Sequence, residues 1–338
     1  MNINQLEQTI KTMITPGKGI LAADESSPTI KKRFDTIKVE STEENRRAYR
    51  ELLFTTPELE KYICGVILYE ETLGQKTADG TPFPQLLAER GIIPGIKVDK
   101  GLILFESSAE EKTTQGLDGL PDRLEEYKKM GARFAKWRVV FKISDIYPSS
   151  LIIKNNACLL ARYAKICQNA GIVPIVEPEV LMDGKHSLEK CAEVSEKVFH
   201  KVFDKLHKHQ VELELMILKP NMIVAGKEFS KQPSVEEVAK ATIKILRRTV
   251  PAAVPTINFL SGGQSDVMAT ENLNAINKIG PQPWYLSFSY GRALQAPCLK
   301  AWLGKKENVT AAQQELLKRA RLNGAAAVGK YSKDADPN

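Results

Sequence analysis

Histidine and closely spaced cysteine are scarce in this chain of 338 residues. Its four histidines form no H-E-x-x-H or H-x-x-x-H pair, and its five cysteines form an odd set without a C-x-x-C motif. Because zinc sites and disulfide frameworks depend on such spacings, we expect no metal, no disulfide framework and a reducing compartment, the cytoplasm. These residues are His186, His200, His207, His209, Cys64, Cys158, Cys167, Cys191 and Cys298.

Long apolar runs are also absent. No run of about 18 apolar residues, the length that a membrane-spanning helix needs, occurs in the chain. The first residues, Met1 to Lys11, are polar and amphipathic and lack the apolar segment of a signal peptide. We therefore expect neither secretion nor a membrane partner.

A basic run is missing as well. Lys and Arg number 48 against 41 Asp and Glu, so the net charge of +7 is spread thinly along the chain. The densest cationic stretch, from His200 to His209, contains Asp204 and apolar residues at helical spacing, which is typical of a solvated helix face. We expect no nucleic-acid partner. The positive excess would instead suit an anion-binding pocket.

Short apolar, β-rich runs alternate with amphipathic stretches along the chain. Strict alternation indicates parallel pairing, because each parallel connection needs a crossover. Eight such runs predict an α/β fold, a (β/α)8 TIM barrel, with residues 1–338 as one domain and 330–338 as a short flexible C-terminal tail. The predicted strands are Gly19–Ala23, Tyr62–Tyr69, Gly95–Val98, Phe134–Ile143, Ile172–Val176, Leu213–Leu218, Val254–Leu260 and Trp284–Ser289, and the clearest helices are Leu120–Met130, Ala157–Ala170, Leu188–Leu206 and Val235–Leu246.

A doubly wound dinucleotide fold is the competing architecture. The segment from Gly17 to Ala22 fits the pattern G-x-G-x-x-A. That fingerprint must follow a strand and open a helix, so that the pyrophosphate meets the helix amino end. Here the glycines precede the predicted strand, which argues against nucleotide binding.

Charged or small polar residues follow or end most of the predicted strands. Residues i and i+2 of a strand share a face, so Lys136 can point with Arg138, and Glu177 with Glu179. In a barrel these side chains would converge at the carboxyl mouth, where such enzymes keep their active sites. Any one of them is more often a loop cap or an ion-paired residue, but seven strand ends behave alike. The candidate residues at these strand ends are Asp24, Ser26, Lys97, Lys136, Arg138, Glu177, Glu179, Lys219, Ser261, Ser289 and Arg292.

Lys219 is the strongest catalytic candidate. It ends a run in which Leu213, Leu215 and Ile217 share its parity, and Pro220 keeps it extended. Burial together with a nearby cation, for which Lys136 is the candidate, would favour a neutral, nucleophilic amine suited to a Schiff base. The alternative is a lysine that snorkels to solvent.

Glycine and hydroxyl side chains follow the last two predicted strands. Ser261-Gly262-Gly263 lets backbone N–H groups approach an anion, and Ser289-Tyr290-Gly291-Arg292 adds a fixed cation. Barrel enzymes often bind phosphate after the seventh and eighth strands. We therefore interpret both loops as phosphate-binding, with two tight glycine turns as the alternative.

Taken together, these motifs resemble the class I fructose-1,6-bisphosphate aldolase family, in the family's order and nearly from end to end. The matching stretches are Leu21–Ser26, Thr42–Arg47, Gly95–Gly101, Thr113–Gly119, Phe134–Arg138, Ile175–Glu179, Leu218–Met222, Phe259–Ser265 and Phe288–Gln295.

The resemblance implies metal-independent, reversible cleavage of fructose 1,6-bisphosphate to dihydroxyacetone phosphate and glyceraldehyde 3-phosphate, in glycolysis and gluconeogenesis, without a cofactor. Lys219 would form the Schiff base, Glu177 would move protons with help from Glu179, Asp24 would deprotonate the C4 hydroxyl, and Lys136 would assist Lys219. Arg138 would orient substrate hydroxyls. The resemblance implies that Ser261, Gly262, Ser289, Gly291 and Arg292 bind the C1 phosphate. For the C6 phosphate it implies Ser26, Thr29 and Lys97, with Lys32, Arg33 and Arg46 nearby. Gly263 is a further implied substrate-binding residue. Family members are usually homotetramers.

Two departures from the family pattern affect these expectations. Pro28-Thr29 stands where the family usually has Gly-Ser, which stiffens the loop beside the C6 phosphate. Family tails commonly continue past Gly329-Lys330-Tyr331 to a tyrosine that helps to protonate the enamine, whereas this sequence ends at Asn338. We expect cleavage to be intact, but proton transfer to the enamine to be slow or carried out by another group. Measuring the rate of enamine protonation with and without an appended family-type tail would test this.

Two other functions fit the same residues. One is a Schiff-base aldolase or transaldolase that acts on another phosphosugar. The other is a scaffold that binds acidic protein filaments through its positive pocket with little catalysis. The joint presence of Lys219, Glu177, Asp24 and Lys136 argues against the scaffold.

Overall fold

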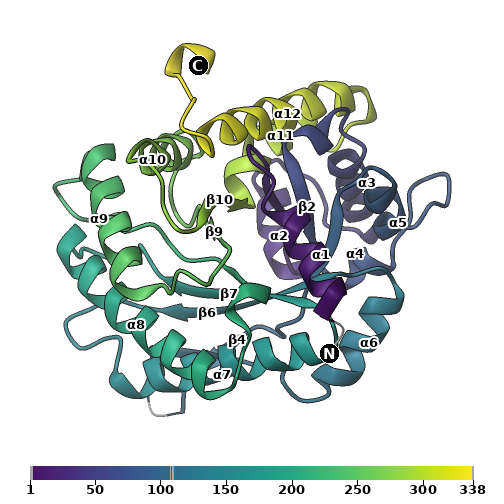
Figure 1. Cartoon of the computed structure of the whole chain (residues 1–338). Coiled ribbons are helices and arrows are strands. Elements are labelled where there is room, and N and C mark those ends of the chain that lie inside the picture. Colours follow the sequence, from purple (N-terminus) through teal and green to yellow (C-terminus); the bar gives the residue numbers. More distant parts are fainter. Residues whose placement is uncertain (1–2, 107, 109, 337–338) are drawn as a thin grey trace.

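Eight parallel strands close into a barrel in the computed structural model of the chain, which describes residues 3–106, 108 and 110–336 (Figure 1). The first and last strands pair, with Ile20 opposite Ser289, so the barrel has no open edge. The predicted (β/α)8 barrel is confirmed. In barrel order the strands are β1 (Gly19–Ala23), β10 (Tyr285–Tyr290), β9 (Thr256–Phe259), β8 (Ile217–Leu218), β7 (Val173–Val180), β6 (Phe134–Phe141), β3 (Ile93–Lys97) and β2 (Ile63–Leu68).

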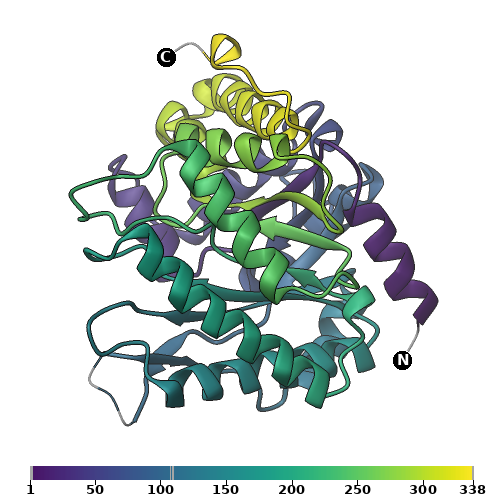
Figure 2. The same cartoon turned by 60° about the vertical axis from the view of Figure 1, so that its left-hand side comes forward.

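Helices surround the barrel in both views (Figures 1 and 2). Several begin at a serine or threonine whose hydroxyl accepts a backbone N–H of the first turn, as Ser234 does for α9 in a full capping box with Glu237. The helices are α1 (Ile3–Met13), α2 (Ser27–Asp35), α3 (Glu43–Phe54), α4 (Glu70–Gly74), α5 (Phe83–Glu89), α6 (Leu120–Lys129), α7 (Ser150–Asn169), α8 (Leu188–Lys208), α9 (Val235–Thr249), α10 (Asp266–Lys278), α11 (Arg292–Trp302) and α12 (Val309–Ala326).

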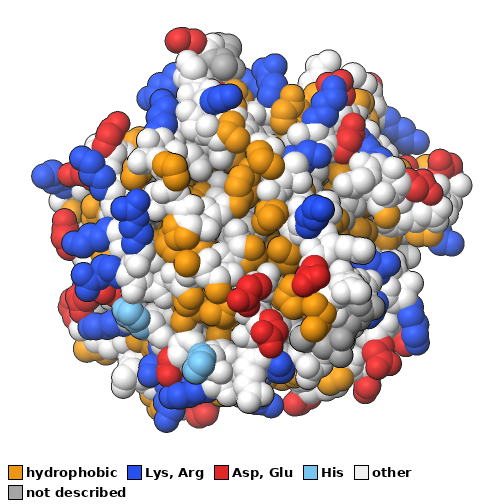
Figure 3. All heavy atoms as spheres, viewed as in Figure 1, with side chains coloured by type: hydrophobic (Ala, Val, Ile, Leu, Met, Phe, Trp, Pro, Cys, Tyr) orange, Lys and Arg blue, Asp and Glu red, His pale blue; other side chains and the backbone are white. Residues whose placement is uncertain are grey.

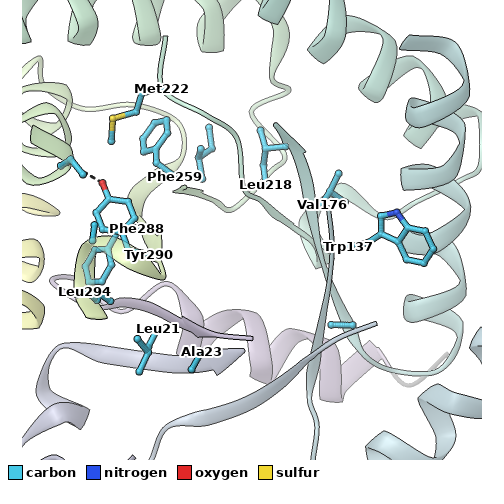
Figure 4. Close-up of a cluster of buried hydrophobic side chains, with 14 of the residues drawn as sticks. Leu21, Ala23, Trp137, Val176, Leu218, Met222, Phe259, Phe288, Tyr290 and Leu294 are labelled. Carbon is cyan, nitrogen blue, oxygen red and sulfur yellow. Dashed lines mark hydrogen bonds between the residues drawn. The ribbon is translucent and has the colours of Figure 1, made fainter. Parts of the chain in front are cut away.

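The buried apolar residues of the strands belong to two different hydrophobic clusters. The outward set packs against the helices and includes Leu21, Trp137, Val176 and Phe288 (Figure 4). The inward set fills the amino half of the barrel, where α1 joins it. This inner cluster comprises Leu6, Ile10, Met13, Ile20, Ala22, Cys64, Ile67, Phe134, Val173, Ile175, Leu215 and Ile217. Apolar side chains therefore fill the amino end of the barrel, and the inward positions beyond them are left for polar groups.

The sixth predicted strand, Leu213–Leu218, is mostly wrong. Only Ile217–Leu218 is strand, and Leu213–Leu215 form a turn of 3₁₀-helix. The α7 side chain Gln168 holds this turn, because its amide donates to the carbonyl oxygens of Glu212 at 2.7 Å and Leu215 at 3.2 Å. The parity argument for Lys219 therefore holds only from Ile217 onward.

The fifth predicted strand was placed too short. It was expected to stop before Glu177, but β7 continues to Val180 and carries both Glu177 and Glu179. Its neighbour β6 is equally long, and the two strands pair over their whole length, with Arg138 opposite Glu177 and Val140 opposite Glu179. Long parallel pairing therefore keeps both glutamates on rigid strand.

A small strand pair and the C-terminal end add to the barrel and its helices. The connection from β3 to α6 contains an antiparallel pair, β4 (Leu102–Leu104) and β5 (Lys112–Thr114). At the C-terminal end, Asp336 accepts from Arg319 at 2.6 Å, and the Tyr331 backbone N–H donates to Asn274 at 3.0 Å. These contacts connect the tail to α10 and α12. The flexibility predicted for 330–338 stays a prediction, and residues 337 and 338 lie outside the described residues.

Close packing inside the barrel makes Gly95 a stability determinant. A Cβ added at Gly95 in β3 would lie 2.2 Å from Cε2 of the buried Phe134 ring in β6. We expect Gly95→Ala to lower the free energy of unfolding by about 1–3 kcal/mol, because a rigid aromatic ring must shift. Urea unfolding would measure this. Gly74→Ala is the control, since its nearest neighbour lies at 3.8 Å, and an equally large loss there would contradict the packing argument.

Candidate active site

Four charged side chains meet inside the carboxyl end of the barrel. Lys136 and Glu177 lie on β6 and β7, two residues beyond the inward-facing Phe134 and Ile175. Asp24 and Lys219 come directly after β1 and β8. Every second residue of a strand points into the barrel. In these four strands the inward positions are therefore apolar at the amino end and charged at or just after the carboxyl end.

The four groups form a line of alternating charge. Lys219 Nζ lies 3.2 Å from Glu177 Oε1, Glu177 Oε2 lies 3.4 Å from Lys136 Nζ, and Lys136 Nζ lies 2.8 Å from Asp24 Oδ2. Their side chains are 5%, 5%, 5% and 13% exposed for Lys219, Glu177, Lys136 and Asp24. Such burial makes each charge depend on its neighbours, because water compensates little here.

Ionisation of the two carboxyls follows from this arrangement. Burial alone would raise the pKa of Asp24, but the Lys136 and Lys219 ammoniums outweigh it and hold that pKa well below its usual value. Burial likewise opposes the charge of Glu177, and Lys219 and Lys136 reverse the effect, so the pKa of Glu177 is lowered. Burial disfavours the Lys136 ammonium, but Asp24, Glu177 and Asp99 raise its pKa above the usual value. At neutral pH the resting site therefore holds two carboxylates around a protonated Lys136.

This line of groups suits carbonyl chemistry. The Lys219 amine is buried next to a carboxylate that can take its proton, which exposes the lone pair needed for attack on a carbonyl. Glu177 touches both lysines and is placed to move protons between an adduct on Lys219 and its surroundings. Asp24 lies on the far side of Lys136, where it can accept a proton from a second position of the same substrate.

Hydroxyl and glycine residues form another wall of the site. Ser289 lies at the end of β10, its hydroxyl is buried, and it has no hydrogen-bond partner within the described residues. Gly262 adopts φ +55°, and a Cβ at Gly291 would lie 3.1 Å from the Ala22 carbonyl oxygen. Arg292 donates to the Gly262 carbonyl oxygen and so ties the two loops together. An unpaired buried hydroxyl beside a cation is a suitable place for an anion.

These groups line one cavity of about 260 Å³. Arg138 and Glu179 at its rim form a hydrogen-bonded ion pair. The structure thus brings together most of the residues that the sequence singled out. The lining residues are Ala22, Asp24, Glu25, Ser26, Thr29, Arg33, Lys97, Lys136, Arg138, Glu177, Glu179, Lys219, Leu260, Ser261, Gly262, Ser289, Gly291 and Arg292.

Three predicted substrate-binding residues lie outside that cavity lining. Arg46 forms two hydrogen bonds with Glu71, at 2.8 and 2.6 Å. Lys32 is exposed and lines an adjoining groove beside α2 and α11, which shares Thr29, Arg33 and Arg292 with the cavity. Gly263 packs against the Lys227 side chain. Their predicted roles in substrate binding stay predictions.

Two groups of polar residues at the site carry no role in the sequence-based prediction. Asp99 accepts from Lys97 at 2.6 Å, and its other oxygen lies 4.0 Å from Lys136 Nζ. The second group is the set of partners of Glu25, which includes Arg50 and Gln295. Asp99 follows the end of β3 by two residues, so the sequence shows it as a charged residue at a strand end without indicating its role. Nothing local marks Arg50, which comes from the distant helix α3.

Other kinds of site find less support in the described part of the chain. There, no group of three or more His, Cys, Asp and Glu side chains is placed to hold a metal ion. None of the helices between residues 3 and 336 has the length and apolar character to cross a bilayer. Basic and acidic side chains are mixed around the rim of the face shown in Figure 3, and hydrophobic side chains with a few acidic ones lie toward its middle.

Comparison with known proteins agrees with this geometry. The family model described as fructose-bisphosphate aldolase class-I matches residues 5–338. The chain is 57% identical over 331 residues to fructose-bisphosphate aldolase of Echinococcus multilocularis, covering 97% of this chain and 91% of the relative. It is 57% identical over 322 residues to the cytosolic fructose-bisphosphate aldolase 4 of Arabidopsis thaliana, covering 95% and 82%.

A solved structure gives the same result. Fructose-bisphosphate aldolase from Plasmodium falciparum, in complex with TRAP and a small-molecule inhibitor, superposes with a TM-score of 0.96 at 55% identity, covering 97% of this chain and 95% of that one. Fold, site and sequence thus agree over nearly the whole length. The chain belongs to the class I fructose-bisphosphate aldolase family and is a carbon–carbon lyase of glycolysis that acts through a lysine Schiff base.

Proposed function

We propose that Lys219 is the Schiff-base lysine of this enzyme and that Glu177 is its proton carrier. Their separation of 3.2 Å is the single observation that carries the proposal. With its proton passed to Glu177, the Lys219 amine attacks C2 of fructose 1,6-bisphosphate. Glu177 gives that proton to the C2 oxygen and takes one from the attacking nitrogen, which leaves a neutral carbinolamine and a protonated Glu177. Glu177 then protonates the departing hydroxyl, water leaves, and a protonated imine forms.

The change in charge at Lys219 supports this double role for Glu177. Beside the Lys219 ammonium the pKa of Glu177 is lowered, although burial opposes this, so the resting group is a base. In the neutral carbinolamine that cation is gone, which raises the pKa of Glu177 and makes it an acid. Glu179, two residues along the same strand and paired with Arg138, assists electrostatically.

Asp24 and Lys136 serve the bond-breaking step in this proposal. Asp24 takes the proton of the C4 hydroxyl, C4 becomes an aldehyde carbon, and the C3–C4 electrons move into the protonated imine. Glyceraldehyde 3-phosphate leaves, and the remaining enamine is protonated and hydrolysed to dihydroxyacetone phosphate. Lys136, 2.8 Å from Asp24, keeps the carboxylate ionised and in position.

Two sets of cavity residues bind the two phosphates in this arrangement. Ser261, Gly262, Ser289, Gly291 and Arg292 hold the C1 phosphate, and the buried, unpaired Ser289 hydroxyl supports that assignment. The C6 phosphate is bound by the second set. Its residues are Ser26, Thr29, Arg33 and Lys97 in the cavity lining, with Lys32 and Arg46 nearby.

We also propose that the enzyme is a cytoplasmic homotetramer. Four large apolar side chains, Ile103, Leu104, Ile146 and Leu151, are 41%, 58%, 74% and 50% exposed. The first two lie on the β4–β5 pair and the others on or just before α7, and the Ser149 hydroxyl donates to Glu111 beside β5 at 2.6 Å. Exposed apolar groups of this kind favour subunit contact. The cytosolic relative from Arabidopsis thaliana supports the location.

Borohydride trapping tests the central assignment. Incubation with dihydroxyacetone phosphate and borohydride should reduce the imine to a stable secondary amine on Lys219, located by peptide mass spectrometry, with parallel loss of activity. The same treatment with EDTA present should give equal labelling. Labelling at another lysine, or none, would overturn the assignment of Lys219, and EDTA sensitivity would overturn the metal-free mechanism.

A further inference from the structure

Glu25 is a buried carboxylate that the proposed mechanism leaves unused. It lies between Asp24 and Ser26, and its side chain is 4% exposed. Arg33 of α2 and Gln295 of α11 donate to Glu25 Oε1, the latter at 2.9 Å, and Arg50 of α3 donates to Oε2 at 2.6 Å. Burial would raise the pKa of Glu25, but Arg33 and Arg50 outweigh it and lower that pKa. The group is therefore an ionised carboxylate held from three helices.

The two arginines differ in what else they face. Arg33 is 25% exposed and lines the substrate cavity, so it faces both Glu25 and the substrate. Arg50 is 3% exposed and absent from the cavity lining, and Glu25 is its only ion-pair partner in the part of the chain described. Arg50 also donates to the Glu25 carbonyl oxygen at 3.4 Å. Only Arg33 can change partners without leaving its place at the cavity.

Gln295 fixes the same carboxylate to the barrel. Its Nε2 donates both to Glu25 Oε1 and, at 2.8 Å, to the backbone carbonyl oxygen of Ala22 in β1. Ala22 lies two residues before Asp24, so one amide group connects α11, β1 and Glu25. The position of Glu25 is therefore set independently of Arg33.

A substrate phosphate that recruits Arg33 must compete with Glu25 for it. A buried carboxylate resists losing a cation, because no water replaces the lost bond. Glu25 can release Arg33 since Arg50 and Gln295 still hold it. We infer that Arg50 and Gln295 are positioning residues that make Arg33 available to the C6 phosphate and thereby favour a bisphosphate over a monophosphate. This inference rests on the proposed role of Arg33 at that phosphate.

Steady-state kinetics with two sugars test the inference. In Arg50→Met, Glu25 keeps Arg33 as its only cation, so we expect KM for fructose 1,6-bisphosphate to rise about tenfold. Cleavage of fructose 1-phosphate, which has no C6 phosphate, should change less than about twofold. Adding Glu25→Gln to that variant should restore most of the lost affinity, because a neutral amide holds Arg33 weakly. Gln295→Met should lower the ratio of fructose 1,6-bisphosphate cleavage to fructose 1-phosphate cleavage by a smaller factor than Arg50→Met does.

Matched variants exclude a general loss of structure. Arg47→Met removes another arginine of α3, one that pairs with Glu44 and Glu51. It should leave the cleavage of both sugars unchanged. Arg50→Lys keeps a cation at the site and should shift the ratio by about threefold, so it decides the question where Arg50→Met does not fold. Equal losses with both sugars, or no restoration by Glu25→Gln, would overturn the inference. Borohydride trapping with dihydroxyacetone phosphate needs no C6 phosphate, so its failure would instead overturn the proposed function.

Discussion

Lys219→Met is expected to lower kcat for fructose 1,6-bisphosphate cleavage by about 10⁵-fold or more. Methionine is close to lysine in length but has no amine, so neither carbinolamine nor imine can form. The remaining phosphate and hydroxyl contacts still bind the sugar, and KM should change little. Stopped assays of triose phosphate release, with borohydride trapping of dihydroxyacetone phosphate in parallel, would measure both effects.

A second methionine variant separates the loss of the Lys219 amine from the loss of a lysine charge elsewhere on the protein. Lys190→Met in α8 removes a lysine that is 42% exposed and paired with Glu193, and it should leave kcat unchanged. Because Lys219→Met also leaves Glu177 with Lys136 as its nearest cation, circular dichroism should confirm that the variant is folded. Activity of Lys219→Met above about one per cent of the wild type would contradict the Schiff-base assignment.

The barrel and most of its active site follow from local sequence pattern. Apolar runs ending in charge mark the strands, and the two-residue repeat places Lys136 with Arg138 and Glu177 with Glu179 on inward faces, as the structure shows. Strand length was harder to predict. Glu177 and Glu179 looked like the end of a strand, but pairing with the long β6 extends β7 past them. Pairing of this kind depends on a neighbour distant in sequence.

Long-range partners account for the other differences. Leu213–Leu215 alternate as a strand would, yet the side chain of Gln168 binds the backbone there and stabilises a turn. Arg46, which the family resemblance places near the C6 phosphate, forms two hydrogen bonds with Glu71 of α4, a partner that its own sequence neighbourhood does not reveal, and its role at the phosphate stays a prediction. Nothing near Arg50 in the sequence points to Glu25, because their contact joins α3 to the end of β1. A single sequence gives no information on such pairs, since neither partner is unusual by itself.

Lys136→Met is expected to damage both stability and catalysis. Lys136 lies 2.8 Å from Asp24, 3.4 Å from Glu177 and 4.0 Å from Asp99, and its side chain is 5% exposed. Without it, buried carboxylates lose their shared cation, which typically costs about 3–5 kcal/mol of unfolding free energy. Cleavage should fall by about 10³-fold or more, because Asp24 is then no longer held as an ionised base.

The stability deficit of Lys136→Met should depend on pH in a definite direction. In the wild type the pKa of Asp24 lies well below its ordinary value of 3.8, although burial opposes this, so its stabilisation is present above pH 3.8 and is lost only as pH falls through the folded value. Lys136 itself has a pKa raised above 10.5, against the effect of burial, so its stabilisation is present below pH 10.5 and is lost as pH rises through the higher folded value. Both contributions are therefore complete between about pH 5 and pH 9.

Removing Lys136 leaves burial to raise the pKa values of Asp24 and Glu177, with Lys219 as the nearest remaining cation. Protonation of these carboxyls on acidification then relieves the variant but not the wild type, so the difference in unfolding free energy should be largest near pH 8 and shrink toward about pH 5. Urea unfolding at both pH values would measure it. Lys142 directly follows β6, is 43% exposed and is paired with Glu110. Lys142→Met should therefore lower the free energy of unfolding by less than about 1 kcal/mol at either pH. A deficit for Lys136→Met that stays constant with pH would show that the variant loses packing rather than compensation of the buried carboxylates.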